Sequence, residues 1–142
     1  MKMNKISMML LKVAAFSALS MGFGLAQSGD RLNVSIPFDF TVGKTMLPAG
    51  DYTIDRTFGS PLVFIRDSQY HVKAAAISMP EYSTGKPSDS KVVFRVHGGR
   101  HYLASTWSSA SGAGREFLQT PAERKVEFAA QQTSYATLLA GR

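Results

Sequence analysis

The chain has 142 residues, of which 44% are hydrophobic and 18% charged, and it contains no cysteine. This composition indicates one ordered globular domain. Without cysteine there is no disulfide framework, no thiolate zinc site, no cysteine nucleophile and no lipid-bearing cysteine of a bacterial lipoprotein. The formal net charge is +6, but Lys2, Lys5 and Lys12 precede every acidic residue, and the remainder carries +3 in scattered positions. Such scattered cations make no stripe for a phosphate backbone, so we expect no nucleic-acid binding.

The first 26 residues predict a cleavable signal peptide. Met1–Lys12 holds three lysines and no acid, Val13–Leu25 is mostly apolar, and Gly24 and Ala26 put small residues at the cleavage position. The apolar run is shorter than the roughly 20 residues of a membrane-spanning helix. We therefore expect cleavage after Ala26, export to the periplasm or the outside, no stable membrane span after cleavage, and a single β domain over residues 27–142.

Alternating side chains predict the start of a sheet. Every second residue from Leu32 to Val42 is apolar, which is the period of a half-buried strand. Because proline cannot donate to a sheet ladder, Pro37 predicts that this strand lies at an edge or breaks there. After turn residues at 43–50, alternation over 51–56 predicts a returning strand with Tyr52 and Ile54 on one face.

The middle of the chain predicts two more short strands and a long loop. Residues 62–66 and 70–78 are rich in β-forming side chains. Residues 79–90 contain two prolines and a glycine and show no periodicity. This segment is predicted to be the longest loop, of a length that is often functional or mobile.

A hairpin over residues 91–107 is the strongest local signal. Gly98 and Gly99 fit a two-residue turn, which fixes the register. That register pairs Val92 with Ser105 and places Trp107 among the core side chains. The opposite face then carries a basic and aromatic set, which is Arg95, His97, Arg100 and Tyr102. Because such a patch can hold an anionic sugar or a lipid head group, we predict it as the candidate ligand-binding surface.

The C-terminal part predicts the single helix. Thr120 and Glu123 form a capping box around Pro121, so a helix is expected from Pro121 to about Gln132. A short strand at 116–119 and a last strand at 135–140 are predicted on either side of it.

No motif predicts catalysis, a cofactor or a metal. His97 and His101 flank the glycine turn, and a two-residue turn points them to opposite faces with no third ligand nearby. A pair of carboxylates for acid and base chemistry needs two acids that converge in space. The acids available for such a pair are Asp51, Asp55, Glu81 and Glu116. Nothing in their spacing brings any two together.

Two segments carry a distinctive pattern. Ile36–Gly43 reads Pro-Phe-x-Phe-x-Val-Gly after Ile36, and Leu47–Tyr52 reads Leu-Pro-Ala-Gly-x-Tyr. In this pattern the chain resembles a family of small secreted proteins of unknown function found in many copies in environmental Gram-negative bacteria. The hairpin ending at Trp107 and the segment 122–124 extend the resemblance over most of residues 27–142. Gly43 stands alone where relatives often have two glycines. The family has no known activity, so the resemblance implies export and a β fold and transfers no site residue.

These patterns predict an all-β domain. We expect an antiparallel β-sandwich or a partly open barrel of about seven or eight short strands with one C-terminal helix. The expected function is that of a non-catalytic domain of the cell envelope or the outside, acting by surface binding or assembly. A cell-envelope glycan or another envelope protein is the expected partner. A secreted hydrolase of polysaccharide or peptide, and a small outer-membrane-associated barrel, are the alternatives.

Overall fold

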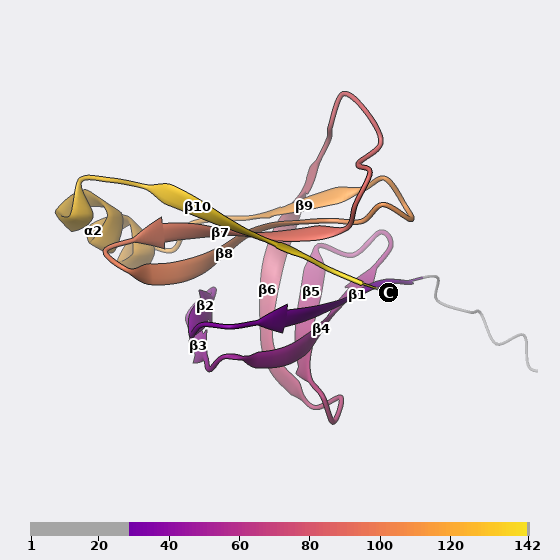
Figure 1. Ribbon diagram of the computed structural model, residues 1–142, viewed down its shortest axis with the longest axis horizontal. Helices are drawn as coiled ribbons and strands as arrows, with labels where there is room; N and C mark the ends of the chain where they lie inside the picture. Colours follow the sequence, from indigo (N-terminus) through magenta and orange to yellow (C-terminus); the bar gives the residue numbers. More distant parts are fainter. Residues whose placement is uncertain (1–28, 142) are drawn as a thin grey trace, which may run out of the picture.

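The computed structural model describes residues 29–141, so the predicted leader lies outside the described residues. These residues form ten strands and one helix (Figure 1). The elements are β1 (Gly29–Ile36), β2 (Phe40–Val42), β3 (Thr45–Leu47), β4 (Gly50–Thr57), β5 (Leu62–Asp67), β6 (Val72–Glu81), β7 (Lys91–His97), β8 (Arg100–Trp107), β9 (Gly114–Phe117), α2 (Pro121–Ala130) and β10 (Ser134–Leu139). The predicted all-β class with one helix near the C-terminus is confirmed, with ten strands where about seven or eight were expected.

The strands form one open sheet that does not close into a barrel. Its order is β1-β4-β5-β6-β9-β8-β2-β3, and β7 pairs with β8 and carries β10 on its other edge. All pairs are antiparallel except β2 with β8. β6 joins the two halves, because its residues 72–77 pair with β5 and its residues 78–81 pair with β9. Figure 1 shows the half with β7, β8, β9 and β10 lying across the half with β1 and β4.

The long alternating segment breaks at its proline, as expected. β1 ends at Ile36, and β2 begins at Phe40 after the break. β1 pairs with β4 along its whole length, so Leu32 and the alternate residues after it point into the core. The end of the chain returns to β1, where Asn33 and Gly141 exchange two backbone hydrogen bonds of 2.8 Å.

The β7–β8 hairpin has the predicted turn but a different register at its far end. Gly98 and Gly99 have φ angles of 56° and 76°, which glycine adopts without steric cost. The ladder shifts between Val93 and Phe94, so Val92 pairs with Thr106 and not with Ser105. After a β-bulge of one residue, each following side chain of the bulged strand lies on the opposite face of the sheet from the one that the unbroken alternation predicts. Trp107 therefore pairs with Lys91 and leaves the core, which corrects the sequence-based placement.

The predicted loop at 79–90 is shorter than expected, because β6 continues to Glu81. Pro80 lies within the strand and pairs with Arg115 of β9. Its missing N–H is tolerated because β6 has already left β5, so that edge of the strand has no partner at this point.

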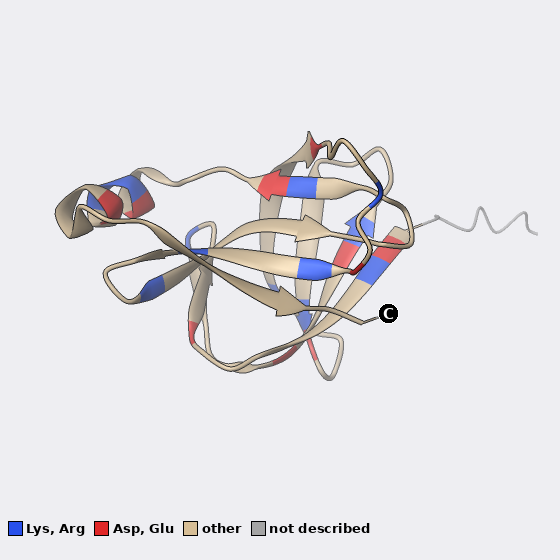
Figure 2. Ribbon diagram, turned by 45° about the horizontal axis from the view of Figure 1, so that its top comes forward, with Lys and Arg blue, Asp and Glu red and all other residues tan. Residues whose placement is uncertain are grey.

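The hydrophobic core lies between the two halves of the sheet. Both halves contribute buried side chains to it, which are Leu32, Val34, Ile36, Phe40, Val42, Leu47, Tyr52, Ile54, Val63, Ile65, Ala74, Val92, Phe94, Leu103 and Phe117. Basic residues and acidic residues are both distributed over the strands and α2 (Figure 2). No helix within residues 29–141 is long and apolar enough to cross a membrane.

Candidate functional site

The four residues predicted as a ligand-binding surface do lie together at one end of the β7–β8 hairpin, but they do not form an open patch. The register pairs Arg95 with Tyr102 and His97 with Arg100, which puts all four on one face. Arg95, His97 and Tyr102 are buried, and His97 has no exposed surface. Arg100 alone is exposed. Three of the four residues predicted for the ligand-binding surface are therefore closed to solvent.

The buried carboxylate of Glu123, on the first turn of α2, accounts for this burial. It accepts hydrogen bonds from Arg95 Nε at 2.7 Å and Nη2 at 3.3 Å, and it lies 3.3 Å from Nε2 of His97. Arg95 Nη2 also donates to the carbonyl oxygen of Phe117 at 3.0 Å. The hydroxyl of Thr120 caps the helix by accepting from the Glu123 N–H at 3.1 Å. Glu123 thus anchors α2 to the sheet, a role that the capping-box pattern alone does not reveal.

A second carboxylate extends this polar cluster to the end of the helix. Nδ1 of His97 lies 3.2 Å from the hydroxyl of Thr133, and that hydroxyl donates to Oε1 of Glu127 at 2.9 Å. Gln119 donates to the other oxygen of Glu127 at 3.0 Å. The hydrogen bonds from Thr133 and Gln119 hold the pKa of Glu127 below its ordinary value. Both ends of α2 are therefore fixed against β7.

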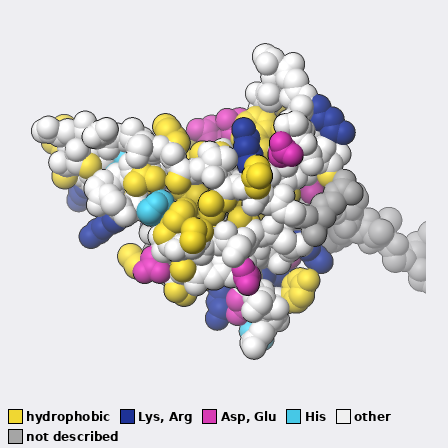
Figure 3. Space-filling model, in the orientation of Figure 1, with side chains coloured by type: hydrophobic (Ala, Val, Ile, Leu, Met, Phe, Trp, Pro, Cys, Tyr) yellow, Lys and Arg dark blue, Asp and Glu magenta, His cyan; other side chains and the backbone are white. Residues whose placement is uncertain are grey.

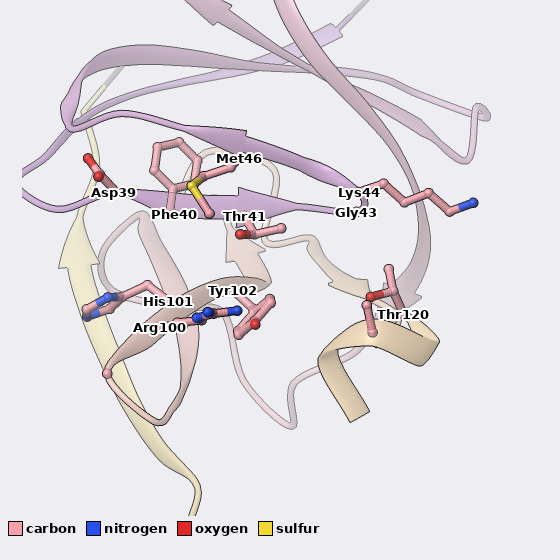
Figure 4. Close-up of a pocket in the computed structure, with 12 residues that line it drawn as sticks. Asp39, Phe40, Thr41, Gly43, Lys44, Met46, Arg100, His101, Tyr102 and Thr120 are labelled. Carbon is pink, nitrogen blue, oxygen red and sulfur yellow. The ribbon is translucent and has the colours of Figure 1, made fainter. Parts of the chain in front are cut away.

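A pocket of about 500 Å³ opens beside this cluster, between the β2–β3 hairpin, the start of β8 and the start of α2 (Figure 4). The parallel pairing of β2 with β8 sets its width, with Phe40 opposite His101 and Thr41 opposite Tyr102. Asp39 and His101 lie at one end of the pocket, and Lys44 and Thr120 lie at the other (Figure 4). The lining residues are Asp39, Phe40, Thr41, Gly43, Lys44, Met46, Gly99, Arg100, His101, Tyr102, Thr120 and Ala122.

Aromatic rings make the floor of the pocket rigid. His101 stacks on Phe38 with ring centres 3.8 Å apart, and Phe38 meets Phe94 of the core edge-on at 5.1 Å. Tyr102 lies 5.7 Å from the ring of His97, so the floor also touches the buried cluster. Met46 is 67% exposed at the rim, which leaves an apolar surface open to a ligand. Hydrophobic side chains also gather near the centre of the face drawn in Figure 3.

The pocket carries excess positive charge. Lys44 and Arg100 line it, and neither forms an ion pair with any residue of the described part of the chain. The carboxylate of Asp39 is the one acidic group of the lining, and it accepts a hydrogen bond from the N–H of Ala49 at 3.1 Å. Two free cations beside one engaged carboxylate favour an anionic ligand group.

The four acids considered for hydrolysis lie in two separate places. Asp55 of β4 pairs with Arg31 at 2.8 Å and with Arg66 at 2.5 Å, and Asp51 is exposed at the start of the same strand. Glu81 and Glu116 lie on neighbouring strands, β6 and β9, on the outer face of the sheet. Neither pair lines the pocket between β2 and β8.

The two histidines of the hairpin point to opposite sides, as the turn predicts. His97 faces Glu123 beneath α2, whereas His101 stacks on Phe38 at the pocket. Within residues 29–141, no three histidine or acidic side chains gather in a way that could hold a metal ion.

The chain was compared with family models, with curated proteins and with solved structures. None of them matches it. The resemblance drawn from the sequence therefore stays a prediction, and the function must be argued from the geometry of the site.

Sequence reasoning found Arg100 and Tyr102 but missed the other pocket residues. Lys44 and Met46 belong to the β2–β3 hairpin, which the parallel pairing of β2 with β8 brings beside Arg100 and Tyr102, and Thr120 comes from the start of α2. A parallel contact between strands so distant in sequence leaves no local pattern, because periodicity reports one strand at a time.

Proposed function

We propose that this protein is an exported, non-catalytic binding domain of the cell envelope or the extracellular space, and that its pocket holds an acidic glycan. The proposal rests on one observation. Lys44 and Arg100 stand without ion-pair partners, among the described residues, over a pocket with an apolar and aromatic floor. Export is supported by the lysine-rich, then apolar, sequence before Gln27.

The chemistry of the lining selects a ligand that is acidic at one point and apolar at another. A carboxylate or sulfate on the ligand would pair with the guanidinium of Arg100 or with Lys44, which lies at the other end of the pocket. The ring of His101 and the side chain of Met46 offer surface for the apolar face of a sugar. An acidic sugar has both parts in one unit, which a simple inorganic anion lacks.

A binding role fits the lining better than hydrolysis. Acid and base catalysis of glycoside cleavage needs two carboxyl groups across the bond. The pocket offers Asp39 alone, and its side chain is already engaged with the backbone of Ala49. The pocket can hold a sugar but lacks the pair of groups that would cleave it.

Isothermal titration of the purified protein with hyaluronan octasaccharide, and with dextran as the neutral probe, tests the proposal. We expect binding of the acidic probe that weakens with added salt, and no binding of dextran. Changing Lys44 and Arg100 together to alanine should weaken it by about tenfold to a hundredfold, since a hydrogen bond to a charged group contributes about 1.5–3 kcal/mol. Lys86→Ala, an exposed cation outside the lining, is the matched control.

Two results would contradict the proposal. Equal affinities of the double variant and the Lys86→Ala control would show that the octasaccharide does not bind in the pocket. Release of new reducing ends from the octasaccharide by the purified protein would show hydrolysis, and the function would then be that of a secreted hydrolase.

A further inference from the structure

Two arginines, one from β1 and one from β5, share a single carboxylate of β4, the strand between them. Asp55 accepts a hydrogen bond from Nε of Arg31 through Oδ1 at 2.8 Å and from Nε of Arg66 through Oδ2 at 2.5 Å. Asp55 alternates with the buried core residue Ile54, so the group lies on the face of the sheet that is turned away from the core. One carboxylate thus orients two guanidinium groups, and the three side chains together carry one uncompensated positive charge.

Tyr70, in the turn between β5 and β6, contacts the same two arginines. Its ring lies against the guanidinium of Arg31, with Cζ of Arg31 5.6 Å from the ring centre. Its carbonyl oxygen accepts a hydrogen bond from Nη1 of Arg66 at 3.1 Å. Tyr70 has a φ angle of 64°, which a bulky residue rarely adopts. Asp55 and Tyr70 therefore hold both guanidinium groups in place, although this puts the backbone of Tyr70 in a strained conformation.

The outer nitrogens of the two arginines have donors to spare. Within residues 29–141, neither Nη1 nor Nη2 of Arg31, nor Nη2 of Arg66, has a hydrogen-bond acceptor. Solvent reaches these groups, since the side chain of Arg31 is 56% exposed and that of Arg66 is 30% exposed. Both line a pocket of about 520 Å³, which shares no lining residue with the pocket between β2 and β8. Asp30 and Arg56 also line it, but they pair with each other and add no net charge.

We propose that Arg31 and Arg66 bind the phosphate group of a phosphate monoester, at a second site separate from the pocket between β2 and β8. A terminal phosphate has three acceptor oxygens and a charge of about −1.5 to −2 at neutral pH, so one group can accept hydrogen bonds from both guanidinium groups. A carboxylate has two oxygens, which a single arginine already occupies when it binds through two parallel hydrogen bonds. Two arginines held beside each other therefore favour an anion with three oxygens.

A purely structural ion-pair link between the strands accounts for less of this arrangement. β1, β4 and β5 are already joined by backbone ladders that continue on both sides of Asp55. One arginine neutralises one carboxylate, so a link of this kind needs only one of the two. Asp67, at the end of β5, does not supply the missing charge, because Lys73 and His71 lie 3.4 and 3.5 Å from its carboxylate. An anion from outside the chain supplies it.

Three matched sugars test the choice of anion by calorimetry of the purified full chain at constant ionic strength. We expect glucose 6-phosphate to bind saturably. Glucose 6-sulfate has the same three terminal oxygens but a single charge, and it should bind about fivefold to tenfold more weakly. Glucuronate, with a carboxylate in the same place, should bind at least about tenfold more weakly than glucose 6-phosphate.

A phosphate monoester can belong to a soluble molecule or to a lipid head group, and a second arm distinguishes the two sources. The protein is sedimented with phosphatidylcholine vesicles that contain phosphatidic acid, and with vesicles of phosphatidylcholine alone. Sedimentation with the phosphatidic acid vesicles only would place the phosphate on a membrane. Binding of glucose 6-phosphate without such sedimentation would place it on a soluble ligand.

Variants identify the groups involved. Arg31→Gln and Arg66→Gln should each weaken glucose 6-phosphate binding by roughly tenfold or more, since each removes charged donors. Arg124→Gln, an exposed arginine of α2 outside the lining, is the matched control and should change the affinity less than twofold. Arg31→Lys keeps the charge but loses the planar fork, so it should also weaken binding, and it keeps the proposal testable if Arg66→Gln fails to fold. The variant with alanine at both Lys44 and Arg100 should bind glucose 6-phosphate as the wild type does, which separates this site from the pocket.

Tyr70→Asn separates binding from stability. Asparagine adopts positive φ angles more readily than tyrosine, and this change removes the ring beside Arg31 while it keeps the carbonyl that contacts Arg66. We expect little change in the melting midpoint, because relief of backbone strain offsets the lost ring contact. The affinity for glucose 6-phosphate should fall at least about threefold, because Arg31 is no longer held in place.

Three outcomes would overturn the proposal. The first is no binding of millimolar glucose 6-phosphate together with no sedimentation on the phosphatidic acid vesicles. The second is an equal affinity of Arg31→Gln and of the Arg124→Gln control. The third is glucuronate that binds as tightly as glucose 6-phosphate, which would show that the two arginines do not select a phosphate.

Discussion

Replacing Glu123 by alanine should cost a large part of the stability of this domain. Glu123 is 2% exposed, and its carboxylate holds both Arg95 and His97 beneath α2. Its loss leaves the Arg95 guanidinium buried without a counter-charge, and breaking a buried pair in this way costs about 3–5 kcal/mol. Domains of this size unfold with about 5–15 kcal/mol, so the midpoint of thermal unfolding should fall by roughly 10–20 °C.

Urea unfolding followed by circular dichroism measures this cost at neutral pH. Asp89→Ala, which removes an exposed acid that accepts a hydrogen bond from its neighbour Ser88, is the control and should cost less than about 0.5 kcal/mol. Replacing Arg95 by methionine and Glu123 by leucine together should recover much of the loss, because no unpaired charge then stays buried. A loss below about 1 kcal/mol for Glu123→Ala would refute the idea that this carboxylate anchors the helix.

Three further predictions concern other parts of the chain. Gly114→Ala should destabilise the domain by about 1–3 kcal/mol, because its Cβ would stand 2.7 Å from the ring of Trp107. A melting midpoint equal to that of the wild type would contradict this packing. Because the pKa of Glu81 is raised in the folded state, its ionisation opposes folding. Glu81→Gln should therefore raise the urea midpoint at neutral pH and leave it unchanged at a pH below the ordinary pKa of glutamate. An equal shift of the midpoint at both pH values would show a cause other than charge. Edman sequencing of the exported protein should begin at Gln27, and a sequence beginning at Met1 would exclude cleavage.

Local patterns were sufficient for much of the sheet. The alternation around Pro37 predicted both β1 and the break before β2, and the paired glycines predicted the turn of the β7–β8 hairpin. The capping box predicted that α2 begins at Pro121. These features depend on residues close in sequence, so their physical cause is visible without the fold.

The predicted orientations of side chains in β7 and β8 were wrong where a bulge in the ladder or the docking of α2 determined which side chains are buried. The bulge beside Phe94 moved Trp107 from the core to the outer face, and a one-residue insertion in the ladder has no sequence signature here. Arg95 and His97 were assigned to a ligand-binding face because polar residues alternate with apolar ones in β7. The docking of α2 over them could have been inferred only by recognising Glu123 as their partner, 28 residues from Arg95.

The central claim is that a ligand enters the pocket between β2, β8 and α2, and chemical-shift mapping tests it most directly. Titration of the ¹⁵N-labelled protein with hyaluronan octasaccharide should move the amide signals of residues 40–46 and 99–102 together, with one dissociation constant. Signals that move only outside these two segments, or no signals that move at all, would contradict the pocket as the site of binding.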